Sequence, residues 1–182
     1  MINFSFSDEQ RSIRDAVLSL CSRKGKFGDG YWLQKDRDGD YPLDFHAEMA
    51  RMGWIGIAMP EVYGGSGLGI TEASILMQAV SESGAGMSGA AAIHLNIFGL
   101  NPVVVFGTDE QKKRMLPPLI AGEHRACFAV TEPSAGLNTL KLKTRAVRRG
   151  DRYVLHGQKV WTSSAQVADK ILILARTQDA DT

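Results

Sequence analysis

The chain has 182 residues, of which 44% are hydrophobic and 23% are charged, as in an ordinary globular protein. Its 21 basic and 20 acidic residues leave a net charge of +1, so bulk charge suggests neither nucleic acid nor an anionic membrane as a partner. No signal-like start is visible, and no apolar run is expected to reach the roughly 18 residues of a membrane helix. Cys21 and Cys127 lack metal-site spacing and are predicted to be free thiols. We therefore expect a soluble, cytoplasmic protein.

Helical signals begin close to the N-terminus. Ser7 and Gln10 have the spacing of a capping box and predict a helix that begins there. Residues 25–41 are rich in glycine and aspartate, and we predict a loop. Pro42 suits the first position of the next helix, which Gly53 is predicted to end.

A glycine-rich loop, GGSGLG at residues 64–69, precedes a helix predicted from Thr71 to about Ser83. A dinucleotide-binding fingerprint that started at Gly65 would need a glycine where Ile70 stands, and a phosphate-binding P-loop would need a lysine that this loop lacks. We therefore predict a structural loop between helices.

Three further signals complete the helical part. Ser88 is predicted to cap an alanine- and glycine-rich helix, which Pro102 would kink or interrupt. Residues 103–106 have strand propensity but stand between helical signals, so we predict helix. Thr108 opens another capping box, and the helix after it is predicted to end near Gly122.

After Gly122 the pattern changes from helical to strand-like. Alternating and buried-strand patterns are separated by turn residues, and Arg149 to Arg152 read as a hairpin turn. The predicted strands lie at 125–131, 141–148, 153–155, 159–162 and 170–175.

The most informative stretch reads FAVTEPSAGLNT and runs from Phe128 to Thr139. Pro133 ends its strand because proline has no N–H to donate. The small residues after Pro133 form a turn that lets a ligand approach the backbone. A companion stretch from Val160 to Ser164 offers one large aromatic and several hydroxyls. We interpret the two stretches as half of a flavin site.

These motifs resemble the acyl-CoA dehydrogenase family, in order and over nearly the whole chain. The resemblance implies an all-α N-terminal helical domain at residues 1–122 and the first, incomplete part of a middle antiparallel β-barrel domain at 123–182, an α+β fold. A C-terminal four-helix domain would follow. The motifs that carry the resemblance are FSDEQ, GGSGLG, FGTDEQKKRMLPPLIAGE, AVTEPSAG, RRGDRYVLHGQKVW and KILILAR.

The resemblance implies FAD as the cofactor. In the family, the positions of Val130 and Thr131 lie near the pyrimidine end of the flavin. The Trp161 position packs beside the isoalloxazine, and Ser163 keeps the hydroxyl that a threonine usually offers to the flavin N5 edge. The FAD-binding residues implied in this way are Phe128, Val130, Thr131, Gly136, Leu137, Trp161, Thr162 and Ser163.

Two departures from the family pattern concern the substrate and the base. Leu137, the position implied to contact acyl-CoA, stands where the family usually has serine, and its side chain cannot donate a hydrogen bond. The family's catalytic base is a glutamate expected beyond residue 182. We therefore assign no catalytic residue here and expect these residues alone not to turn over.

In the family, a base removes the α proton of an acyl-CoA thioester while the flavin accepts the β hydrogen as hydride. An electron-transferring flavoprotein is the usual acceptor, and the intact protein is expected to be a homo-oligomer, a tetramer. Two alternatives stay open. One is a related flavoenzyme of the same fold, such as a nitroalkane oxidase or a flavin monooxygenase component, and the other is an inactive, flavin-free scaffold.

Other polar residues are given structural roles. Glu132 is predicted to be a hydrogen-bond acceptor, Glu72 and Glu82 to be solvated or locally paired, and His94 to be a hydrogen-bonded core or cavity histidine. The four histidines have no metal-ligand spacing. A solvated basic face is predicted for Lys141, Lys143, Arg145, Arg148 and Arg149.

Overall fold

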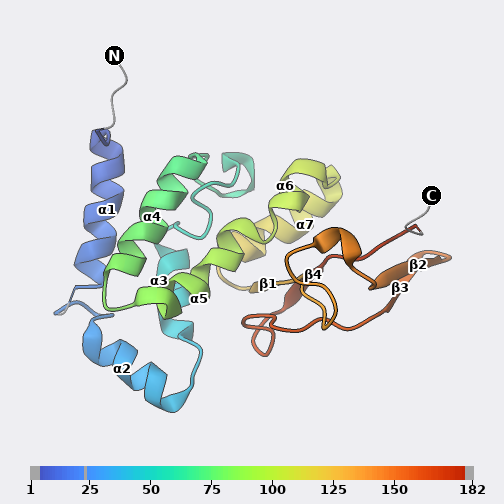
Figure 1. Ribbon diagram of the computed structural model, residues 1–182. Coiled ribbons are helices and arrows are strands. Elements are labelled where there is room, and N and C mark those ends of the chain that lie inside the picture. The colour runs from blue at the N-terminus through green and yellow to red at the C-terminus, as the bar shows by residue number, and fades with distance from the viewer. Residues whose placement is uncertain (1–4, 23, 179–182) are drawn as a thin grey trace. The chain divides into compact units, whose positions relative to one another are not determined.

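The computed structural model describes residues 5–22 and 24–178 (Figure 1). It divides the chain into two compact units, Met1–Arg125 and Ala126–Thr182. Helices make up the first unit and short strands the second, which is the α+β order expected. Among the described residues the strands form no closed barrel.

The first unit contains seven α-helices and one short 3-10 helix in its described residues. Between them they bury an apolar cluster that includes Phe27, Phe45 and Met49. Pairing between α1 and α4 is reinforced at their surfaces, where Gln10 donates to Glu72 at 2.8 Å and Arg14 pairs with Glu82 at 2.8 Å. The elements are α1 Asp8–Leu20, α2 Asp29–Asp38, α3 Leu43–Arg51, η1 Glu61–Tyr63, α4 Ile70–Glu82, α5 Gly86–Phe98, α6 Asn101–Phe106 and α7 Asp109–Ile120.

The two predicted capping boxes are confirmed. At the start of α1, the Gln10 amide donates to the Ser7 hydroxyl at 3.2 Å, and the Thr108 hydroxyl accepts from the Gln111 amide at 3.3 Å at the start of α7. The predicted cap at Ser88 is wrong. The helix begins earlier because Gly86 has a φ of +50°, which glycine adopts readily and which turns the chain into α5.

The loop predicted at 25–41 is also wrong, because α2 occupies most of it. The Trp32 indole is buried, donates to the Phe27 carbonyl at 2.8 Å, and packs edge-on against Phe45 with the ring centroids 4.9 Å apart. This tertiary contact outweighs the weak helix propensity of a glycine- and aspartate-rich stretch. Gly39, with a φ of +67°, ends the helix.

The glycine-rich loop is structural, as predicted. Its amides are already bonded: Gly65 donates to the Pro60 carbonyl at 3.2 Å, and Gly67 donates to the Met59 carbonyl at 2.8 Å. A Cβ on Gly65 would lie 2.2 Å from the Met59 carbonyl oxygen. These contacts leave those two amides unavailable to a phosphate.

The region from α5 to α6 confirms two expectations and differs from a third, that no apolar run reaches the length of a membrane helix. The helix is interrupted between Phe98 and Asn101, Pro102 lies in the first turn of α6, where its missing N–H costs little, and residues 103–106 are helical as predicted. Taken together, Gly86–Phe106 span 21 residues, and the most apolar window within them has a mean hydropathy of 1.5, so the stretch is long and apolar enough to cross a membrane by length and composition alone. Half of this stretch's apolar window is buried in the unit, and core helices of soluble proteins pass the same criterion.

Within residues 126–178, which the structure describes, the second unit contains four short strands and one 3-10 turn. The β2–β3 hairpin turns at Gly150, whose φ is +64°, and pairs antiparallel with Ala146 opposite Leu155. By contrast, β1 and β4 pair in parallel, so the prediction of an antiparallel arrangement is wrong for this pair. About forty residues separate the two strands, which is enough for the crossover that parallel pairing needs. The elements are β1 Ala126–Ala129, η2 Thr139–Lys141, β2 Arg145–Arg149, β3 Arg152–His156 and β4 Lys170–Ile173.

The strand predicted at 159–162 is not formed. Val160 makes one backbone hydrogen bond, to the Thr131 carbonyl at 2.9 Å, and the chain then turns at Trp161. A φ of +60° at Trp161 is incompatible with a continued strand.

Candidate functional site

The predicted site begins where β1 ends. Leu174 donates to the Ala129 carbonyl at 3.1 Å, which is the last ladder contact of this strand. Pro133 then occupies the second position of a tight turn, closed by Glu132 N to Ala135 O at 2.9 Å and Ala135 N to Glu132 O at 3.1 Å. The sequence FAVTEPSAG therefore forms a strand followed by a rigid turn.

Three successive residues of this segment accept hydrogen bonds from Val160, which begins the companion stretch, and from Lys159, which directly precedes it. The Lys159 ammonium donates to the Val130 carbonyl at 2.8 Å and to the Glu132 carboxylate at 3.0 Å. Between these two contacts, the Val160 amide donates to the Thr131 carbonyl at 2.9 Å. The structure therefore brings together the two stretches that the sequence predicted to share one site.

Glu132 is the centre of this junction. Its carboxylate also accepts from the backbone amides of Lys143 at 2.7 Å and Thr144 at 2.8 Å. Burial alone would raise the pKa of Glu132, but the hydrogen bonds from Thr144, Lys143 and Lys159 outweigh it and lower the pKa to about 2. Glu132 is thus an ionised structural acceptor, as predicted.

The aromatic of the companion stretch is held in an unusual state. Trp161 has a φ of +60° and the residue is 89% exposed, and Ser164 has a φ of +61°. Between them, Thr162 is half-buried and Ser163 is exposed. Left-handed backbone at a bulky residue occurs where the surrounding structure imposes it, often at ligand sites.

The remaining predicted site residues are presented to solvent. Leu137 is fully exposed, and a Cβ on Gly136 would meet no atom within 4 Å. Phe128, on β1, is 40% exposed. The described contacts therefore unite Val130 and Thr131 with the start of the companion stretch, whereas these three residues line open surface.

An apolar cavity of about 270 Å³ lies beside the junction. Lys159 of the junction is one of its lining residues, and β4 supplies two isoleucines, Ile171 and Ile173. The cavity is lined by Ala129, Thr144, Leu155, Gly157, Lys159, Thr162, Ala165, Ile171 and Ile173.

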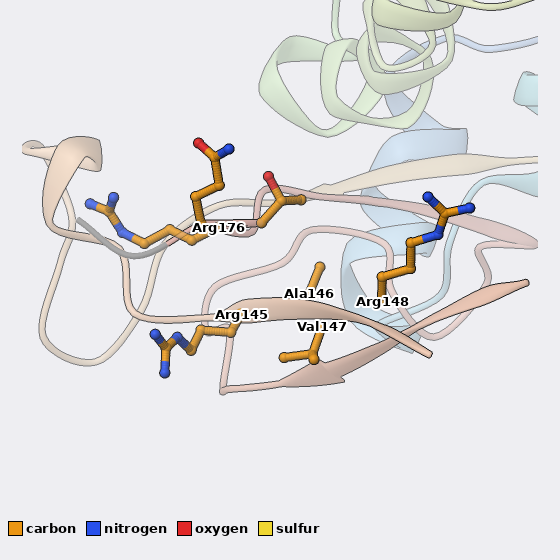
Figure 2. A pocket seen from close by; sticks show the side chains of 7 residues that line it. Arg145, Ala146, Val147, Arg148 and Arg176 are labelled. Atoms are coloured by element: carbon orange, nitrogen blue, oxygen red, sulfur yellow. The ribbon is translucent and has the colours of Figure 1, made fainter. Parts of the chain in front are cut away.

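The basic face on β2 holds a second cavity of about 270 Å³ (Figure 2). Figure 2 shows the guanidinium groups of Arg145, Arg148 and Arg176 pointing in different directions. Arg176 is moreover engaged, because its Nε donates to the Leu142 carbonyl at 2.6 Å and the group also bonds the Leu140 carbonyl. The arginines do not converge on one point. The basic residues predicted to be solvated are all exposed, but they do not share one strand face, because Lys141 and Lys143 precede β2 and Arg145 and Arg148 point in different directions.

Two sequence-based assignments are revised by this geometry. Sequence reasoning did not assign Lys159 to the site. The available signal was Glu132, an acidic residue at the end of an apolar strand, which needs a cationic partner if it is buried. His94 was expected in the core but is exposed, with its ring 5.8 Å from that of Phe98. Position 94 lies on the exposed face of α5. Among the described residues, the histidine that is buried is His46.

Family comparison covers both units. Residues 7–123 match the N-terminal domain of acyl-CoA dehydrogenases, and residues 127–182 match their middle domain. The chain belongs to the acyl-CoA dehydrogenase family. The middle-domain match contains every residue of the Glu132 junction, so this junction lies in the acyl-CoA dehydrogenase middle domain.

Individual members of the acyl-CoA dehydrogenase family match nearly all of this chain. It is 36% identical to the acyl-CoA dehydrogenase FadE12 of Mycobacterium tuberculosis, covering 99% of this chain and 45% of FadE12. It is 35% identical to the mitochondrial isovaleryl-CoA dehydrogenase of Bos taurus, covering 94% and 40%. The crystal structure of glutaryl-CoA dehydrogenase from Mycobacterium smegmatis superposes with a TM-score of 0.84 at 28% identity, covering 96% and 44%. The chain thus spans less than half the length of these relatives.

Proposed function

We propose that the full-length protein containing this chain is an FAD-dependent acyl-CoA dehydrogenase, which oxidises acyl-CoA thioesters between the α and β carbons. One observation carries the proposal. The two stretches expected to face the flavin are held together by three hydrogen bonds in succession, one from Val160 and two from Lys159, the residue directly before the companion stretch. These contacts lie inside the part of the chain that matches the family's middle domain.

The residues at this place suit a flavin. An indole that is 89% exposed leaves a large apolar face in water, and a planar ring stacked on it would remove that face from solvent. The exposed Ser163 hydroxyl two residues later can donate to a ring nitrogen. Gly136 leaves its backbone open to a close approach. We infer that Trp161, Ser163, Thr131 and Gly136 hold FAD, with Phe128, Val130, Leu137 and Thr162 at its edges.

FAD, when bound, supplies the acceptor for the hydride that leaves the β carbon. The residues of this chain position and shield. Trp161 excludes water from one face of the ring, and Thr131 and Ser163 fix the ring's orientation by hydrogen bonds. The proton on the α carbon requires a base, which we propose lies outside the 182 residues.

Leu137 bears on substrate recognition. Its fully exposed side chain offers apolar surface at a position where the acyl-CoA dehydrogenase family usually has the hydroxyl of a serine. We propose that this position contacts acyl-CoA through its backbone and its apolar side chain. Two of the relatives reported above are named for different acyl groups, isovaleryl-CoA and glutaryl-CoA, so the acyl group of this protein has to be found by assay.

The proposal extends to the electron acceptor, the oligomeric assembly, the cellular location and the metabolic role of the enzyme. We propose an electron-transferring flavoprotein as electron acceptor, a homotetramer as the assembly, a cytoplasmic location and a role in the degradation of fatty or related acyl groups.

The test is an assay of the purified full-length protein with a panel of acyl-CoA thioesters and an artificial electron acceptor. We expect a yellow protein whose flavin absorption is bleached anaerobically by at least one acyl-CoA and by no nitroalkane. A yellow protein that is bleached only by a nitroalkane would favour the nitroalkane oxidase alternative. A colourless protein that no added FAD reconstitutes would overturn the proposal.

A further inference from the structure

We propose that Glu132 and Lys159 form a positioning pair, which sets the distance between the two flavin-facing stretches of the proposed site. The inference rests on the proposed function for the identity of the ligand. It adds two residues that are not expected to touch the flavin and assigns them control over those that are.

The first step is the location of the pair. Lys159 immediately precedes Val160 and Trp161, and Glu132 immediately follows Thr131. The contacts of the ammonium with the Val130 carbonyl at 2.8 Å and with the Glu132 carboxylate at 3.0 Å lie on either side of the Val160–Thr131 hydrogen bond. One side chain therefore anchors the companion stretch to both neighbours of Thr131.

The second step is burial. The side chains are only 3% exposed for Glu132 and 10% exposed for Lys159. A carboxylate and an ammonium at such depth are stable only when each is paired and hydrogen-bonded, so neither can move away without leaving a buried charge behind. The junction is therefore rigid, unlike the exposed ion pairs on the helices of the first unit.

The third step excludes direct chemistry by the carboxylate. Glu132 Oε1 accepts from Lys159 and from the Thr144 amide, and Oε2 accepts from the Lys143 amide. A carboxylate that is held by three donors and ionised in this way is a poor general base, because taking a proton would cost these bonds. Its role is structural support of the site.

The fourth step connects the pair to Trp161. The left-handed backbone of Trp161 begins two residues after Lys159, and an unfavourable φ of this kind persists only where neighbouring contacts impose it. Lys159 is the charged anchor nearest to that bend. Loss of the anchor should therefore release the bend and change where the indole and Ser163 stand.

The experiment uses the full-length protein prepared as apoprotein and titrated with FAD. Lys159→Met keeps the length of the side chain and removes the charge, Lys159→Arg keeps the charge, and Lys170→Met removes an exposed charge from β4 as the matched control. We expect Lys159→Met to weaken FAD binding at least tenfold and to shift the flavin absorption bands. Lys159→Arg should stay within about threefold of the wild type, and Lys170→Met should be unchanged.

A double variant protects the test against simple unfolding. Glu132→Gln combined with Lys159→Met leaves no unpaired charge in the interior, so it should fold even where Lys159→Met does not. It should still bind FAD at least tenfold more weakly with shifted bands, because the Val130 carbonyl has lost its donor.

Wild-type FAD affinity and an unshifted spectrum in a folded Lys159→Met protein, or in the double variant, would overturn the positioning role. Wild-type protein that binds FAD but oxidises no acyl-CoA would contradict the proposed function alone. Wild-type protein that binds no FAD would overturn both.

Discussion

At the scale of single residues, Glu132 and Trp161 occupy states that are costly for their types. Glu132 is charged inside the second unit, and Trp161 is apolar, exposed and left-handed. The first cost is offset by three donors, and the proposed flavin would offset the exposure of the indole by covering it. Both residues lie within the stretches proposed to face the flavin.

The lowered pKa of Glu132 predicts an acid-sensitive junction. Its pKa falls from an ordinary 4.5 to about 2 on folding, so the stabilisation is fully present above pH 4.5 and is lost as the pH falls towards 2. Urea unfolding midpoints of the full-length protein should drop between pH 6 and pH 3. Glu132→Gln should show a smaller drop across the same range, and an equal drop in both proteins would contradict the assignment.

Trp161 offers a prediction that separates stability from binding. Because its side chain is almost wholly in solvent, Trp161→Ala should change the free energy of unfolding of the apoprotein by no more than about 0.5 kcal/mol. The loss of stacking, about 1–1.5 kcal/mol, should weaken FAD binding roughly tenfold. Thermal unfolding of the apoprotein and an FAD titration measure the two effects, and a large stability loss with unchanged FAD affinity would show an ordinary packing role.

At the scale of elements, α2 exists because of what it buries. Its sequence DGYWLQKDRD has little intrinsic helix preference, and Trp32 is its one buried residue. The rings of Tyr31 and Phe45 pack edge-on against that indole, each with its centroid 4.9 Å from it. Phe27 packs edge-on against Tyr31 at 4.9 Å and against Phe45 at 5.2 Å, so it closes the same aromatic cluster. The helix is therefore held by tertiary packing.

Trp32→Ala should accordingly destabilise the first unit by about 3–5 kcal/mol, because it opens a cavity in the aromatic cluster and removes the bond to the Phe27 carbonyl. Leu33→Ala is the matched control on the same helix, since Leu33 is 57% exposed, and it should cost less than about 1 kcal/mol. Denaturant unfolding followed by far-UV circular dichroism measures both. Equal losses would show that α2 is not anchored by its tryptophan.

The glycine-rich loop makes a second prediction at this scale. Gly65→Ala would place a methyl group 2.2 Å from the Met59 carbonyl oxygen, so the loop would have to shift and the variant should lose about 1–3 kcal/mol of stability. Gly30→Ala, where a Cβ meets no atom within 4 Å inside α2, should instead be neutral or stabilising by up to about 1 kcal/mol. Thermal unfolding of the two variants should move in opposite directions or differ clearly in size.

At the scale of the whole molecule, the two units differ in how completely each buries its own apolar residues. The apolar cluster of the first unit is drawn entirely from residues 17–97, all on its own side of the boundary. In the second unit, all five residues of β3 are exposed, Tyr153 and Leu155 among them. The first unit thus has the internal core that independent folding requires.

Residues 1–125 should therefore fold when produced by themselves. The expected result is a helical circular dichroism spectrum and a single cooperative thermal transition. Trp32→Ala in this shorter protein serves as the control, because it should lower the midpoint. A spectrum without helical bands, or a transition without cooperativity, would show that the first unit depends on the second.

Local signals in the sequence determined much of this protein. Capping boxes at Ser7 and Thr108, the hairpin turn at Gly150 and the tight turn that contains Pro133 act through neighbouring atoms, so they could be predicted from the residues alone. The strand before that turn ends earlier than predicted, at Ala129. The resemblance to acyl-CoA dehydrogenases carried the proposed FAD residues, since the roles of Trp161 and Ser163 depend on a ligand and not on local pattern.

Only the tertiary structure decided the remaining features. The helix around Trp32 and the parallel pairing of β1 with β4 depend on partners distant in the chain, which no local pattern records. The stretch FAVTEPSAGLNT could be identified from the sequence, but its partner Lys159 could not. A lysine is expected at the surface unless the fold places a buried carboxylate beside it. Interactions between residues close in sequence determine the helix caps and turns. Burial depends on contacts between distant parts of the chain, and it determines the charge and the geometry of the site.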